Sequence, residues 1–333
     1  MIKNLNKIFL KRYSRKNFLK ILSFGLISLF LATGKSKELF AKTAKQLEPR
    51  KRRNIKTNYD LVTVHGENIE EMTKRIIDEL GGIEKFVKKG DIVVVKPNIG
   101  WNRAPEYAAN TNPFLVAAVV KLCLKAGAKK VKVFDNTCNE EKMCYKNSGI
   151  EKAVKEAGGD IFFPDRWKYY AADFKTPAQM QDFPIYSDAV NCDCFINIPI
   201  AKTHGHTKLT LSIKNLMGVC GGNRSTMHWD IDKKLPEVLS FIKPDLNIID
   251  GYRILLRNGP RGGNLEDVKK ASVLIASADA VLADAYASQT LYNINPENIG
   301  HIKEAAKSGL GNMNISKAKI KTFKIRIVFG VIS

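Results

Sequence analysis

Residues 91–98 read DIVVVKPN, residues 111–127 read TNPFLVAAVVKLCLKAG, and residues 130–134 read KVKVF. The first stretch contains a β-branched run of the kind that is buried in a parallel sheet. The second has a capping residue and a proline at its start, an apolar helix pattern from Phe114 to Lys125, and Gly127 at its end. The third is again typical of a strand. Together they predict a strand, helix and strand that follow one another in an α/β fold.

The same alternation continues to the end of the chain. We expect further strands at 161–163, 194–198, 246–249, 272–275 and near 324–329. We expect further helices at 151–157, 211–217, 235–242, 280–290 and 296–308. This pattern predicts a single large α/β domain over residues 58–333, with a mostly parallel sheet and helices on both faces.

The N-terminal 34 residues have the layout of an export signal. A basic region from Lys3 to Lys20 precedes the uncharged apolar run 21–32, and residues 14–20, SRKNFLK, resemble the twin-arginine signal with lysine in place of its second arginine. The run is shorter than the roughly 20 residues of a spanning helix. Cleavage near Ala32-Thr33-Gly34, an uncleaved anchor and a buried helix all remain open. We expect export by the twin-arginine machinery to the periplasm or the extracytoplasmic face of the membrane.

Residues 35–57 carry many Lys and Arg and are predicted to be a solvated linker that contacts anionic lipid headgroups. Residues 1–56 hold 16 Lys and Arg against two Asp and Glu, which is two thirds of the net charge of +21. The predicted domain has no stripe of basic residues interleaved with aromatic ones, so we expect no nucleic-acid partner.

The six cysteines do not form a recognised motif. No Cys-x-x-Cys is present, so the chain has no ferredoxin-type iron–sulfur motif. Cys138, Cys144, Cys192 and Cys194 remain open to metal binding or oxidation, whereas Cys123 and Cys220 are typical of buried thiols. No Gly-x-Ser-x-Gly elbow is present, which argues against a serine hydrolase.

Polar side chains follow several of the predicted strands. These are Lys96 and Asn98 after the first strand, Asp135 after the next, Lys202 and His204 after a third, and Asp250 after a fourth. In open α/β sheets ligands bind outside the carboxyl ends of the strands. We therefore expect one cleft at these ends, with Lys96, Asn98, Asp135 and Lys202 at a cofactor or ligand.

Three histidines lie within 25 residues of one another, namely His204, His206 and His228. Two histidines separated by one residue can face one ligand, and a third from a later loop can complete an open metal site. The spacing matches no zinc-finger or His-Glu-x-x-His motif, so ordinary hydrogen-bonded histidines are the alternative. A transition metal or a metal-containing cofactor at these residues is the first hypothesis.

Three further positions complete the expected site. Lys214, ten residues after His204, is a candidate covalent or anion-binding amine, and Asn215 follows it. Asp250 is a candidate catalytic carboxylate that orients a histidine or acts as a base. Arg261 lies in a glycine-rich loop that can cradle a phosphate or carboxylate, although plain turns have the same composition.

Many of these motifs, taken in order, resemble a bacterial and archaeal family known as domain of unknown function 362. The shared residues run from Val93 to Gly311 and are Lys96-Pro-Asn98, Thr111-Asn-Pro113, Asp135, Lys202-Thr-His204, Lys214-Asn215, His228, Asp250-Gly251, Asn258-Gly-Pro260, Gly262-Gly263, Asp279 and Asp284. The resemblance implies that relatives often carry an iron–sulfur module and sometimes a twin-arginine signal. This chain has no such module.

The order of His204, Lys214 and His228 is also similar to that in the lactate racemase family. In that family a nickel-pincer nucleotide is attached to a lysine and bound by histidines. The likeness implies that such a cofactor would be attached to Lys214 and bound by His204 and His228.

The sequence therefore supports two hypotheses about function. The first is a metal- or cofactor-dependent enzyme that acts on a small anionic molecule, with redox or racemase-like chemistry. The second is a non-catalytic extracytoplasmic binding protein for a carboxylate or a metal ion.

Overall fold

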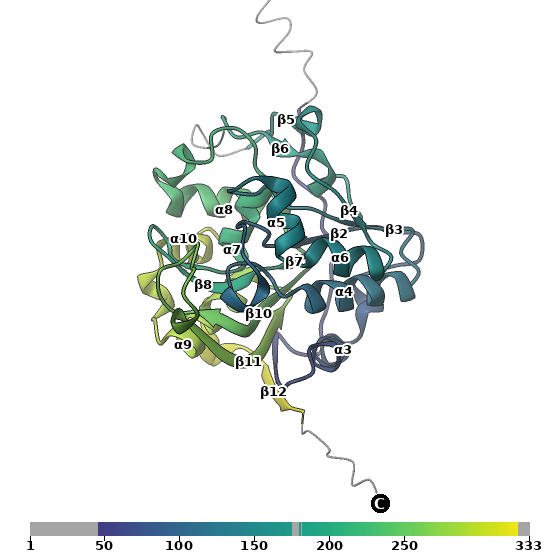
Figure 1. The fold of residues 1–333 in the computed structure, drawn as a ribbon, viewed down its shortest axis with the longest axis vertical. Coiled ribbons are helices and arrows are strands. Elements are labelled where there is room, and N and C mark those ends of the chain that lie inside the picture. Colours follow the sequence, from purple (N-terminus) through teal and green to yellow (C-terminus); the bar gives the residue numbers. More distant parts are fainter. Residues whose placement is uncertain (1–45, 175–179, 181, 326–333) are drawn as a thin grey trace, which may run out of the picture. The chain divides into compact units, whose positions relative to one another are not determined.

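The computed structural model describes residues 46–174, 180 and 182–325. A central sheet runs through these residues in the order β12-β1-β11-β10-β7-β2-β3-β4, with β8 beside β10 and β9 beside β8 (Figure 1). The strands of this sheet are β1 (Leu61–His65), β2 (Ile92–Pro97), β3 (Lys130–Val133), β4 (Asp160–Ile161), β7 (Cys194–Ile198), β8 (Ile200–His204), β9 (Lys208–Thr210), β10 (Leu246–Leu255), β11 (Val268–Ser277) and β12 (Ile320–Lys324). A separate short ribbon pairs β5 (Tyr169–Tyr170) with β6 (Ile185–Tyr186).

The predicted fold class is confirmed, because most neighbouring strands of the sheet are parallel. Parallel pairs run from β10 through β7, β2 and β3 to β4, and β11 is antiparallel to both β10 and β1. The helices are α3 (Ile69–Glu79), α4 (Pro113–Lys125), α5 (Glu141–Asn147), α6 (Ile150–Glu156), α7 (Ser212–Asn215), α8 (Ile231–Ile242), α9 (Ala280–Tyr292) and α10 (Gly300–Lys307).

Helices cover both faces of the sheet. Successive residues of a strand point to opposite faces, and in β2 Val93 and Val95 pack with α3, α4, α5 and α6, while Val94 packs with α7, α8, α9 and α10. Both faces of the central strands are therefore apolar, as the continuous β-branched run predicted.

Several elements match their predicted ranges closely. Asn112 caps α4 through its side chain, which accepts the N–H of Phe114, and Pro113 takes the first helical position. The predicted helix at 211–217 is a single α-turn, α7, followed by the 3-10 turn Leu216–Val219. The predicted strand near 324–329 lies mostly outside the described residues, and β12 ends at Lys324.

The segment Lys202–His204 is not the loop that we expected after a strand. It forms part of β8, which pairs with β9 in a hairpin, so that Lys202 lies opposite Thr210 and His204 opposite Lys208. The hairpin follows β7 after the single residue Pro199. Strand β8 therefore extends the sheet where a loop was predicted.

Residues 46–57 are not a solvated linker, and the compact unit begins at Gln46 rather than at residue 58. Arg50 is buried and pairs with Asp245, and it also donates to the carbonyl of Lys243. Arg53 donates to both oxygens of Asp91. These basic side chains form ion pairs with carboxylates of the domain, and the ion pairs neutralise their charge.

The predicted export signal, residues 1–34, and residues 35–45 of the predicted linker lie outside the described residues. Among the helices of the described ranges, none is both long and apolar enough to cross a membrane.

Replacing Arg50 by alanine is expected to lower the free energy of unfolding by about 3 kcal/mol, because it removes the buried partner of Asp245 and leaves only the longer, 3.9 Å ion pair with Arg52. Urea unfolding of both variants checks this. The control is Lys51→Ala, at an exposed neighbouring position, which should change stability by less than about 0.5 kcal/mol. Equal midpoints for the two variants would show that residues 46–57 do not anchor the domain.

Candidate functional site

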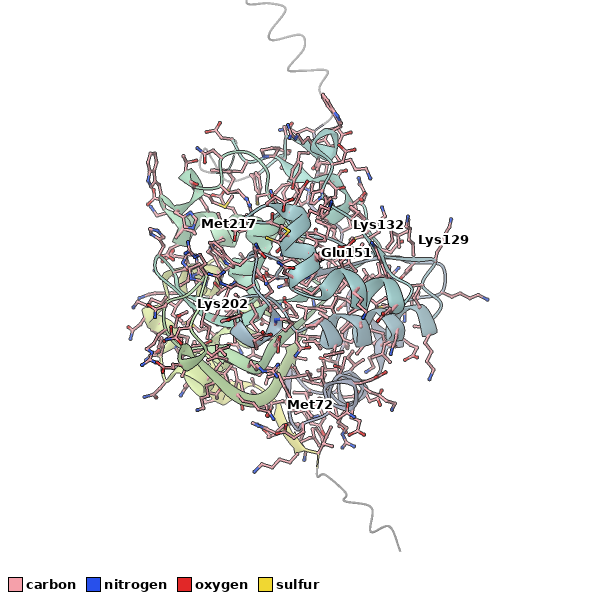
Figure 2. The ribbon with its side chains drawn as sticks, viewed as in Figure 1. Met72, Lys129, Lys132, Glu151, Lys202 and Met217 are labelled. Atoms are coloured by element: carbon pink, nitrogen blue, oxygen red, sulfur yellow. The ribbon has the colours of Figure 1, made fainter. Side chains whose placement is uncertain are left out.

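A cleft of about 520 Å³ opens at the carboxyl ends of β2, β3 and β8. Its lining combines amide, imidazole and cationic groups, and includes Asn98, Trp101, Asp135, Asn136, Cys138, Lys202, His204, His206, Lys214, Asn215, Met217, Arg224 and His228. The predicted cleft is thus present, and it gathers most of the residues that the sequence singled out. Lys202 and Met217 are both buried beside it, whereas Lys129 is exposed at the edge of the molecule (Figure 2).

An ion pair between Lys96 and Asp135 lies at the base of the cleft. The Nζ of Lys96 is 2.8 Å from Oδ1 of Asp135 and donates to the carbonyl of Pro97. The other oxygen of Asp135 accepts the backbone N–H of Ile99. A Cβ added to Gly218 would lie 1.9 Å from Asp135 Oδ1, so only glycine lets the chain pass this close to the pair.

Two asparagines extend this ion pair into a buried network. Asn215 Oδ1 accepts hydrogen bonds from Lys96 Nζ at 3.3 Å and from Asn98 Nδ2 at 3.0 Å. Asn98 Oδ1 in turn accepts from Lys202 Nζ at 2.9 Å. The network links β2, β8 and α7, and it leaves few buried polar atoms of these side chains without a partner.

Lys202 has no carboxylate partner among the described residues. Its Nζ donates to Asn98 and, at 2.6 Å, to the carbonyl of Ala109. Burial lowers the pKa of Lys202 to about 7, with Cys138 and Asp135 opposing and Lys214 and Lys96 assisting. In its ammonium form, Lys202 keeps a third N–H for a ligand.

Lys214 lies on α7 and is 8% exposed. Its Nζ contacts the thioether sulfur of Met217 at 2.9 Å, and burial lowers the pKa of Lys214 to about 8. The start of α7 is held by Asp284, which accepts the N–H groups of Ser212 and Ile213. Asp284 therefore positions the helix that carries Lys214.

The three histidines come together at the mouth of the cleft, with ring centroids 5.0–6.0 Å apart. Nδ1 of His204 accepts the backbone N–H of His206, so the neutral ring carries its proton on Nε2. Nδ1 of His228 faces the carbonyl of Ser225 at 3.2 Å and must donate, which leaves Nε2 as a basic atom. Nε2 of His204 is thus a hydrogen-bond donor, and Nε2 of His228 is an acceptor.

Both rings are held in their neutral form. Burial lowers the pKa of His204 to about 2, assisted by the positive charge of Lys214. Burial and Lys214 also lower the pKa of His228. Burial, assisted by the positive charge of Lys214, therefore keeps His204 and His228 uncharged at neutral pH.

As placed, the histidines do not fit a metal ion. Within residues 46–174, 180 and 182–325, no group of three or more His, Cys, Asp and Glu is arranged to hold one. Metal binding through Nε2 of His204 would require the ring to move its proton and release the N–H of His206. The metal hypothesis for His204, His206 and His228 therefore stays a prediction that their hydrogen bonds do not favour.

Asp250 and Arg261 do not line the cleft. The carboxylate of Asp250 is buried and accepts the backbone N–H groups of Asn112 and Tyr252, so it holds the start of α4 instead of a histidine. Burial raises the pKa of Asp250 to about 6. Arg261 is exposed, and its neighbour Pro260 is the residue of that loop that reaches the cleft.

Sequence reasoning missed two polar members of the cleft, Arg224 and Cys138. Arg224 donates to the carbonyls of Asn136 and Thr137, which places its guanidinium at the wall. Cys138 is exposed and lines the same cavity. Cys138 was left open to metal binding or oxidation, and neither residue has a spacing that ties it to His204.

The family model described as "Domain of unknown function (DUF362)" matches residues 93–289, which confirms the resemblance. The chain is 29% identical over 246 residues to the "Thylakoid-associated protein sll1697" of Synechocystis sp., covering 71% of this chain and 74% of that protein.

The fold is also similar to the lactate racemase apoprotein from Thermoanaerobacterium thermosaccharolyticum, with a TM-score of 0.39 and 10% identity. The alignment covers 76% of this chain and 57% of the racemase chain, so this chain spans little more than half of its length. This distance is too great to carry a residue or a ligand across.

Proposed function

We propose that this chain, which belongs to the DUF362 family, binds a small organic anion in its cleft and moves a proton on that anion. The observation that carries the proposal is the imbalance of charge in the cleft. Lys202, Lys214 and Arg224 line it, and among the described lining residues the one carboxylate is Asp135.

That carboxylate is already paired with Lys96. The remaining cations have amide, carbonyl or thioether partners, which leave their positive charge uncompensated. Because a buried charge without a counter-charge is costly, an anionic ligand would gain most from this site. A carboxylate or phosphate matches the donors of lysine and arginine.

The two histidines supply the proton transfer. The Nε2 atom of His228 is basic and neutral, as a general base requires, and Nε2–H of His204 can donate to an oxygen on which charge develops. In this proposal Lys202 and Arg224 bind the anionic group, and Lys214 lies beside the reacting carbon.

Anion affinity is expected to fall as the pH rises from 6.5 to 9.5, because the Lys214 ammonium loses its proton near pH 8. Isothermal titration with pyruvate, oxalate and inorganic phosphate checks this. Lys214→Gln should weaken binding at pH 6.5 about tenfold, while Lys208→Gln, at an exposed position of β9, should leave it unchanged. Absence of binding by every probe at pH 6.5 would refute the anion site.

Wild-type protein in D2O is expected to exchange carbon-bound protons of at least one of pyruvate, L-lactate and L-malate, followed by NMR. His228→Gln should still bind that anion but lose exchange, because glutamine can donate to Ser225 and cannot act as the base. Binding without exchange in the wild type would contradict proton transfer and favour the non-catalytic binding protein.

We also propose that the chain is exported and works at the extracytoplasmic face of a membrane. The basic and apolar pattern of residues 1–34 supports this, as does the relative that is named for its association with thylakoids.

Export is expected to depend on Arg15. Arg15→Lys should retain the protein in the cytoplasm of its native host, because the remaining lysine pair is no twin-arginine signal. Lys16→Arg restores the full pair and should be exported at least as well as the wild type. Cell fractionation and immunoblotting read out both variants. Unchanged export of Arg15→Lys would exclude this route.

A further inference from the structure

We propose that Lys214 is a nucleophile, whose amine forms an imine with the carbonyl of a 2-oxo acid bound in the cleft. This inference rests on the anion site proposed above and names its substrate class. It also assigns to Lys214 a covalent step that anion binding alone does not require.

The surroundings of the amine separate Lys214 from an ordinary surface lysine. Its side chain is 8% exposed, yet it lines an open cavity of about 520 Å³. Its Nζ contacts the sulfur of Met217, a weak acceptor that does little to hold an ammonium proton. Within the described ranges no carboxylate forms an ion pair with it.

Neighbouring groups shift the pKa of Lys214 in both directions, and burial decides the outcome. The groups that act on Lys214 are Cys138, Arg224, Cys220 and Lys96, and Lys214 acts in turn on Lys202, His204, His228 and His301. Burial lowers the pKa of Lys214 to about 8, with Arg224 and Lys96 assisting and the two thiols opposing. A useful fraction of the amine is therefore neutral near pH 7.5, which attack on a carbonyl requires.

The cleft also offers a place for the acid group of the substrate. The ammonium form of Lys202, which a bound carboxylate stabilises, and the guanidinium of Arg224 are donors that line the same cavity as Lys214. A molecule with a carboxylate next to a carbonyl can meet these donors and Lys214 at once. This favours a 2-oxo acid over a simple aldehyde or an isolated phosphate.

The fold holds Lys214 in place on a short, clamped helix. Asp284 accepts two N–H groups at the start of α7, and Asn197 donates to the carbonyl of Ser212. Asn215, the next residue, is fixed by hydrogen bonds to Asn197 and Asn98. A nucleophile needs this restriction so that its amine stays near the bound carbonyl.

The step is balanced within the site. The neutral Nζ attacks the carbonyl carbon, a C–N bond forms, and the C=O double bond becomes a C–O single bond. One proton of the amine passes to the oxygen, to which His204 Nε2–H donates a hydrogen bond as its charge develops. The second proton of the amine then passes to the resulting hydroxyl, the C–O bond breaks, water leaves, and a C=N bond remains on Lys214. No oxidant or reductant is consumed. The imine then withdraws electrons from the adjacent carbon, whose proton His228 can accept.

Reductive trapping tests the proposal directly. Full-length protein is incubated with pyruvate, 2-oxobutyrate, oxaloacetate or 2-oxoglutarate, reduced with sodium borohydride, and examined by intact mass spectrometry and peptide mapping. We expect one reduced adduct per chain, on the peptide that carries Lys214. Lys214→Arg keeps a cation but cannot form an imine, and should give no adduct. Lys208→Arg should trap as the wild type does.

Binding of the same acids is measured in parallel by isothermal titration in the wild type and in Lys214→Arg. Binding without an adduct, or an adduct on Lys202 or another lysine, would overturn the imine and leave the anion site standing. Neither binding nor an adduct would overturn both proposals. If Lys214→Arg does not fold, the mapping of the wild-type adduct still decides between Lys214 and other lysines.

Discussion

Three buried lysine amines, those of Lys96, Lys202 and Lys214, lie near the carboxyl ends of the strands, and within the described residues only one of them has a carboxylate partner. Asp135 pairs with Lys96, whereas Lys202 donates to Asn98 and Lys214 contacts the sulfur of Met217. Holding two further amines out of water costs free energy that apolar packing elsewhere must offset. Sites that carry such a cost are commonly functional, because a complementary ligand supplies the missing charge. Burial, with the positive charge of Lys214 assisting, also keeps His204 and His228 neutral.

Residues 46–57 bind the opposite, amino-terminal edge of the sheet, just before β2 and β10. Asp91 immediately precedes β2 and is bound by Arg53, and Asp245 immediately precedes β10 and is bound by Arg50. Ion pairs between arginines and carboxylates thus stabilise the amino ends of these strands. At the carboxyl ends, where the cleft opens, two of the described lysines have no carboxylate partner. The sheet connects the two, so a rigid scaffold supports the lysines of the cleft.

Much of the architecture could be predicted from the sequence. The apolar run at Val93–Val95 and the cap at Asn112 are local signals, and both lie where their chemistry indicates. The gathering of Asn98, Asp135, Lys202 and His204 followed from the rule that parallel strands end at a common edge. The details depended on long-range contacts that no local pattern encodes. Arg50 was predicted to lie in a solvated linker, because its partner Asp245 is 195 residues away in the sequence. Asp250 was predicted to be catalytic, because Asn112, whose backbone N–H it accepts, is 138 residues away.

The central claim is that the amine of Lys214 is kept partly neutral by burial and by neighbouring cations. Its titration is measured most directly by NMR of the 15N-labelled lysine Nζ groups, with Lys214→Arg to assign the signal. We expect a midpoint near pH 8 in the free protein, shifting upward when an anion binds. A midpoint near 10.5, the ordinary value for lysine, that no anion moves would contradict it.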